Sequence, residues 1–110
     1  MPANIVRYSG KSAADTAQTV STVPGVKLRV KHVTVSYSAA PTQTGVIITL
    51  NSGIAASYDD VLSTGTANVR YTYWTPDNDL WLQADDQLDV LCPSAGGVVT
   101  SSATIVCEVT

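Results

Sequence analysis

Five aspartates crowd the stretch from residue 77 to residue 89, around the tryptophan at position 81. They are Asp77, Asp79, Asp85, Asp86 and Asp89. Carboxylates beside a flat aromatic ring are typical of sites that bind or cleave sugars, and the run Asp77-Asn78-Asp79 offers the hard oxygen ligands that Ca²⁺ prefers. Glycoside cleavage needs two carboxyl groups about 5–10 Å apart in a cleft, one of them neutral. Nothing in the sequence indicates such a cleft, and the EF-hand spacing is absent, so we interpret these carboxylates first as solvated turn residues.

The other candidates for covalent or metal chemistry are the single histidine, His32, and the two cysteines, Cys92 and Cys107. The scattered serines include no Gly-x-Ser-x-Gly motif, so a Ser-His-Asp mechanism lacks its parts. The cysteines lack the Cys-x-x-Cys spacing and the neighbouring histidine of a zinc site. Both fall on the apolar parity of late strands, which predicts buried free thiols, with a cross-strand disulfide as the second possibility. We therefore expect no catalytic residue, no cofactor and no metal, and a protein that is not an enzyme.

Basic and apolar residues alternate in the stretch from 27 to 37, KLRVKHVTVSY. Period two predicts a strand with one dry face, and Lys27, Arg29 and Lys31 then form a positive ridge on its wet face. Such a ridge suits an acidic partner surface, or protects an exposed strand from edge-to-edge aggregation. Nucleic acid is an improbable partner, because the net charge is −3 and eight of the nine acidic residues lie in the second half of the chain.

Short β-strands are the elements that must position these residues. The chain has no Phe and is rich in Val and Thr, whose branched side chains suit pleated sheets. Turn signals recur between strand candidates at 4–8, 16–22, 26–37, 46–50, 58–62, 68–74, 80–83, 87–91 and 98–109. Eight or nine strands at this spacing predict one all-β domain over residues 1–110, a sandwich or barrel with little or no helix.

Three local patterns refine this prediction. The apolar parity of the strand at 26–37 switches between Val30 and Val33, which requires a β-bulge near Lys31 and His32. Tyr71 and Tyr73 fall on one face of their strand and Trp74 on the other, so that Trp74 and Trp81 flank the acidic turn 75–79. The strand at 98–109 is expected to pair with that at 87–91 as a hairpin across the turn 93–97.

The chain shows no sign of membrane insertion or export. No segment approaches the ~18 consecutive apolar residues of a membrane helix. The N-terminal sequence MPANIVR lacks the basic-then-apolar plan of a signal peptide. We expect synthesis and use in the cytosol, without a membrane partner.

Residues 81–90, WLQADDQLDV, are similar to the phrase "large apolar, x, x, Gly/Ala-Asp-x-Leu-x-Val" of many viral and TNF-like jelly rolls. With its small size, its Ala-, Thr- and Val-rich strands and its lack of an enzyme motif, the whole chain resembles the small jelly-roll decoration, or cement, proteins of tailed-bacteriophage capsids. The resemblance implies a jelly-roll β-sandwich that forms a homodimer or homotrimer. It also implies assembly in the host cytoplasm and binding between capsomers of the major capsid protein lattice, on the outer surface of the virion, where the protein stabilises the shell. Residues 1–23 would then be an extended N-terminal arm.

Aromatic and basic side chains are the best candidates for the interface of such a protein. The expected interface residues are Tyr71, Tyr73, Trp74, Trp81, Lys27, Arg29 and Lys31. The alternative is a small carbohydrate- or receptor-binding β-sandwich, alone or on a tail or head fibre. It would use Trp74 or Trp81 with Asp77, Asp79, Asp85 or Asp86.

Overall fold

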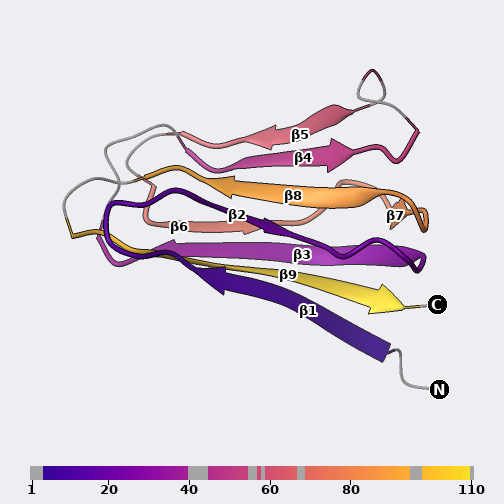
Figure 1. Cartoon of the computed structure of the whole chain (residues 1–110), viewed down its shortest axis with the longest axis horizontal. Helices are drawn as coiled ribbons and strands as arrows, with labels where there is room; N and C mark the ends of the chain where they lie inside the picture. Colours follow the sequence, from indigo (N-terminus) through magenta and orange to yellow (C-terminus); the bar gives the residue numbers. More distant parts are fainter. Residues whose placement is uncertain are drawn as a thin grey trace.

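The computed structural model describes residues 4–39, 45–54, 57, 59–66, 69–94 and 98–109. The regular elements in these ranges are nine strands (Figure 1). They are β1 (Asn4–Lys11), β2 (Gln18–Ser21), β3 (Leu28–Tyr37), β4 (Ile47–Asn51), β5 (Asp60–Thr64), β6 (Tyr71–Trp74), β7 (Leu80–Leu82), β8 (Gln87–Cys92) and β9 (Ser101–Val109). The expected strand starts at Tyr58 and Asn68 lie outside the described residues, as do positions 95–97 of the expected turn.

The strands form two antiparallel sheets that lie face to face (Figure 1). Sheet A has the order β1-β9-β3-β6, with β7 also paired to β3, and sheet B has the order β2-β8-β4-β5. Because β6 pairs with the second half of β3 and β7 with the first, they act as two halves of one strand. Apart from β4 to β5 and β6 to β7, every connection crosses from one sheet to the other. This order is that of a jelly roll, which confirms the predicted all-β sandwich.

One expected pairing is wrong. The strand at 98–109 does not form a hairpin with that at 87–91, because β8 lies in sheet B and β9 in sheet A. β9 pairs with β1 and β3, whereas β8 pairs with β2 and β4. Both strands have one apolar face. In a jelly roll each buries that face in the core from its own sheet, so the two strands lie across the core from each other rather than side by side.

The segment for which we expected an extended arm contributes the edge strands of both sheets over its described residues. β1 pairs with β9 along its whole length, and β2 pairs with β8. The Gln18 side-chain amide, at the start of β2, donates a hydrogen bond to the Ser101 hydroxyl at 2.8 Å. Both strands of this segment, β1 and β2, are thus paired within the protomer.

The core lies between the sheets and is built by alternation along the strands. On β3 the buried residues are Leu28 and Val30, then Val33, Val35 and Tyr37. The pairing of β3 with β9 shifts register between Val30 and His32, so the predicted bulge is confirmed. It lets one long strand keep an apolar face inward on both sides of the shift.

Cys92 and Cys107 are free and fully buried, as the first interpretation predicted. Burial disfavours the charged thiolate and raises the pKa of each thiol from 9.0 to about 11. Burial, with Cys92 nearby, raises the pKa of Tyr37 from 10.0 to about 12. All three groups are therefore held neutral by the core.

These pKa shifts predict that the protein loses stability in alkali. Between pH 9 and 11 the unfolded chain releases the thiol protons while the folded chain retains them, so the free energy of unfolding falls as pH rises. The expected loss is about 2 kcal/mol per thiol, measured by urea unfolding at pH 8 and at a pH near 11. In the Cys92→Ala/Cys107→Ala double variant the fall should be smaller and begin about one pH unit higher, where Tyr37 titrates. Equal stability of the wild-type protein at both pH values would contradict the buried thiols.

Candidate interface on the outer face of sheet A

The outer face of sheet A carries cross-strand rows of side chains that meet because directly opposed residues of antiparallel strands share a face. Arg29 of β3 is opposite Trp81 of β7 on one side and Glu108 of β9 on the other. Further along β3, Thr34 is opposite Tyr73, and Ser36 is opposite Tyr71. The alternation that buries Leu28, Val33 and Val35 turns these polar and aromatic side chains outward.

Tyr71 and Tyr73, which we expected on the same face of their strand, are 65% and 68% exposed. Each ring is supported by one neighbour. The ring of His32 is stacked on that of Tyr73 with centroids 5.4 Å apart, and the Arg70 guanidinium carbon lies 5.2 Å from the centroid of Tyr71. Two aromatic rings thus stand exposed at one end of the face.

Trp81 lies toward the other end, half-buried beside Arg29. The Lys27 ammonium nitrogen lies 5.0 Å from the centroid of its ring, a cation–π contact worth roughly 0.5–1 kcal/mol at an exposed site. Trp74 differs from the other expected interface residues, because it is opposite the buried Val33 and packs against the core. The structure therefore brings six of the seven expected residues to one face and turns Trp74 inward.

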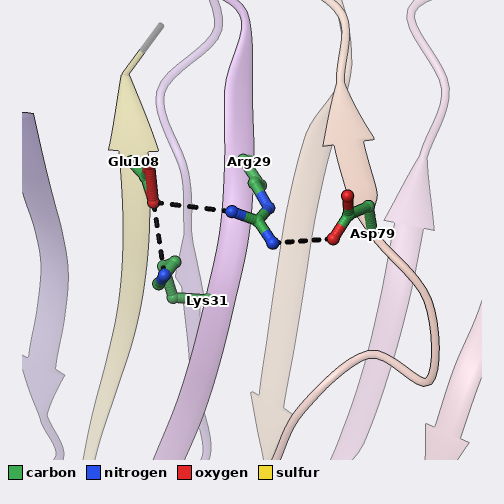
Figure 2. Close-up of polar contacts among 4 residues, drawn as sticks. All are labelled: Arg29, Lys31, Asp79 and Glu108. Atoms are coloured by element: carbon green, nitrogen blue, oxygen red, sulfur yellow. Dashed lines mark hydrogen bonds and ion pairs between the residues drawn. The ribbon is translucent and has the colours of Figure 1, made fainter. Parts of the chain in front are cut away.

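Carboxylates from distant parts of the chain lie against the positive ridge (Figure 2). Arg29 Nη2 is 2.7 Å from Asp79 Oδ1, in the turn before β7, and its Nη1 is 3.8 Å from Glu108 Oε2. Lys31 Nζ is 3.3 Å from the same Glu108 oxygen. Such partly exposed pairs contribute at most about 1 kcal/mol each to stability. Their larger effect is on the surface potential, because the ridge expected from sequence is partly neutralised.

The basic residues are nevertheless gathered on one side of the sandwich. The six basic residues all lie on strands of sheet A or directly before one: Arg7, Lys11, Lys27, Arg29, Lys31 and Arg70. Asp60 and Asp89, by contrast, are on sheet B, and the remaining acids other than Glu108 are in connections between strands. The uneven charge of the two halves of the sequence is therefore an uneven charge in space.

Two of the five crowded aspartates hold the fold together. The Asp86 carboxylate accepts hydrogen bonds from the backbone N–H groups of Gln83 at 3.1 Å and Gly53 at 3.0 Å. The Asp89 carboxylate accepts from the Ser21 hydroxyl at 2.6 Å and from the Gln87 amide at 2.6 Å. These contacts tie neighbouring strands and turns, and Asp89 lies on β8 itself, so these two carboxylates are structural rather than the solvated turn residues that we expected.

The alternative sugar site is assembled only in part. A hollow of about 240 Å³ brings Trp74 together with Asp77 and Asp79, while Asp85 and Asp86 lie in the next turn, between β7 and β8. Among the described side chains, no group of three or more His, Cys, Asp or Glu is placed to hold a metal ion. Nor does the described part of the chain contain a helix long and apolar enough to span a membrane.

The chain matches no protein-family model and no curated protein sequence. Among solved structures it is similar to a chain of the "Cyanophage Pam1 capsid asymmetric unit", with a TM-score of 0.54 and 14% sequence identity over 98% of this chain and 86% of that one. A second similar structure is the "Family 16 Carbohydrate Binding Module-2", with a TM-score of 0.43 and 14% identity over 91% of this chain and 72% of that one. The chain thus shares its overall fold with a protein of a cyanophage capsid.

Proposed function

We propose that this chain is a non-enzymatic structural protein of a phage virion, which decorates the outer surface of the capsid between capsomers as a homodimer or homotrimer. The observation that supports it best is the jelly-roll fold, which aligns over 98% of the chain with a component of a phage capsid asymmetric unit. Direct contact with the major capsid protein would strengthen the shell.

The capsid-binding surface in this proposal is the Trp81 end of sheet A's outer face, formed by Trp81, Lys27, Arg29 and Lys31. Trp81 offers a large, partly exposed ring held by Lys27, the kind of aromatic anchor that dominates binding energy in interfaces. The cations around it favour an acidic partner surface and speed the encounter with it. Asp79 and Glu108 lie against the arginine and partly neutralise its charge in the free protein.

The test is the solution mass of the purified protein by light scattering, followed by sedimentation with and without empty capsids of the parent phage. The proposal expects a discrete dimer or trimer that sediments with the capsids. A monomer that stays in the supernatant would overturn it.

A carbohydrate- or receptor-binding module is the second candidate, because one hollow joins Trp74 with Asp77 and Asp79. Trp74 packs against the core, however, and so offers less ring surface for stacking than an exposed aromatic would. Titration with neutral glycans and with Ca²⁺ separates this candidate from the virion role, since a decoration protein of the proposed kind needs neither.

A further inference from the structure

A groove lies on the outer face of sheet A at the end away from Trp81. It consists of two adjoining hollows of about 500 Å³ and about 320 Å³, which share Ser36, Tyr71 and Ser102 in their walls. Two cross-strand rows build its floor. One row runs Lys11, Ser102, Ser36, Tyr71 across β1, β9, β3 and β6, and in the next row Thr104, Thr34 and Tyr73 continue the groove. We call this feature the Tyr71 groove.

The Tyr71 groove is lined mainly by hydroxyl groups. Serines and threonines line it from β3, β6 and β9 and from the residues next to β1, β3 and β9. Hydroxyls both donate and accept hydrogen bonds, so they match the hydroxyl groups of a sugar in either direction. The exposed rings of Tyr71 and Tyr73 add flat apolar surface beside them. Hydroxyls next to an exposed aromatic ring suit a pyranose, whose edge is polar and whose face is apolar.

The charge of the groove is positive. Lys11 and Arg70 both line it, and the described residues of its walls include no aspartate or glutamate. The ion pairs among the described residues involve Arg29 and Lys31, and none involves Lys11 or Arg70. Arg70 is held in place, because its Nε donates a hydrogen bond to the Tyr37 carbonyl oxygen at 3.1 Å. A fixed guanidinium and an ammonium group without carboxylate partners suit an anionic ligand.

We propose that the Tyr71 groove binds an acidic oligosaccharide. One sugar ring stacks on Tyr71, hydroxyl groups of the oligosaccharide bond to Ser36 and Ser102, and carboxylates of successive sugar units lie beside Arg70 and Lys11. This inference goes beyond the proposed capsid role and is independent of it. Arg29 and Ser36 are seven residues apart on β3, roughly 20 Å at the rise of a strand, so the Trp81 end and the groove can be occupied at once.

The experiment is a calorimetric titration of the full chain with the hexasaccharide of galacturonic acid and with its fully methyl-esterified form, which keeps the ring and hydroxyls but loses the charge. The proposal expects the free acid to bind at least tenfold more tightly than the ester. Tyr71→Ala should lower the affinity about tenfold or more, and Tyr71→Phe should retain most of it because the ring remains. Since Tyr71 is 65% exposed, these variants should fold, and circular dichroism checks it.

Lys11→Gln has a matched control in Arg7→Gln. Both residues lie on β1 and both changes remove one positive charge, but only Lys11 lines the groove. The proposal expects Lys11→Gln to lower the affinity for the free acid several-fold and Arg7→Gln to leave it almost unchanged. Equal losses of affinity in the two variants would indicate attraction by overall charge, and the proposal of a specific site would be wrong. Three further outcomes would overturn the proposal: the free acid does not bind, the ester binds equally well, or oligothymidylate binds more tightly than the free acid. None of these outcomes bears on capsid binding, because no capsid is present.

Discussion

Replacing Leu88 by alanine is expected to lower the free energy of unfolding by about 2–5 kcal/mol, one of the two largest effects that the structure predicts. Leu88 is fully buried at the middle of the core, on a strand with partners on both sides. Its backbone is fixed by Thr22, whose hydroxyl accepts from the Leu88 N–H at 3.0 Å and whose N–H donates to the Leu88 carbonyl oxygen at 3.1 Å. The site cannot collapse easily around the lost methyl groups, so a cavity remains. Urea unfolding measures the loss.

Leu91→Ala is the matched control, because it makes the same chemical change on the same strand. Leu91 is 37% exposed on the outer face of sheet B, opposite Ile47. Its truncation should cost less than about 1 kcal/mol, since little buried area is lost. If the two variants lost stability equally, one face of β8 would not be buried and the other exposed, and the two-sheet sandwich would be wrong.

The alternation that makes this pair of variants predictable is visible in the sequence. Leu88, Val90 and Cys92 share one parity of β8 and are all fully buried. The same rule places the bulge near Lys31 and puts Tyr71 and Tyr73 on one face of β6, but it does not say that this face is the outward one. Period two is a local property of the chain, so strands, faces and bulges follow from it directly.

Strand partners do not follow from period two. The expected hairpin of the last two strands was wrong because any strand with one dry face can pair with any other of the same kind. The choice between neighbours and strands across the core depends on the whole order of the sheets. In this jelly roll the partners of β9 are β1 and β3, at the other end of the sequence.

The candidate surface also depends on strand partners, which period two does not predict. Lys27, Arg29 and Lys31 are a ridge in the sequence, but Glu108 and Asp79 approach Arg29 only once the strands are paired. The Tyr71 groove draws its row from residues 11, 36, 71 and 102, each on a different strand. No spacing rule joins such positions. The signal that the sequence does contain is that Tyr71 and Tyr73 share one face of their strand.

Replacing Lys27, Arg29 and Lys31 together by serine is expected to reduce capsid affinity at least tenfold at low ionic strength while the protein stays folded. The three ion pairs are partly exposed and contribute at most about 1 kcal/mol each, so the loss of stability should be modest. In the proposed interface capsid binding loses more, because the cations that attract an acidic partner surface are gone. The difference between wild type and variant should shrink as salt is raised, since charges more than about 8 Å apart are screened at 0.15 M. Co-sedimentation with empty capsids across a salt series measures it.

The double variant Asp79→Asn/Glu108→Gln tests whether more positive charge at the Trp81 end strengthens capsid binding. It breaks the same three ion pairs as the serine variant and should lower stability by a similar modest amount. It leaves all the cations in place, however, and removes the carboxylates that neutralise them. Capsid binding at low salt should therefore become stronger than that of the wild type, because the surface potential of the Trp81 end rises. If both variants weakened binding equally, the ion pairs would matter for the shape of the interface rather than its charge, and the acidic partner surface would be ruled out.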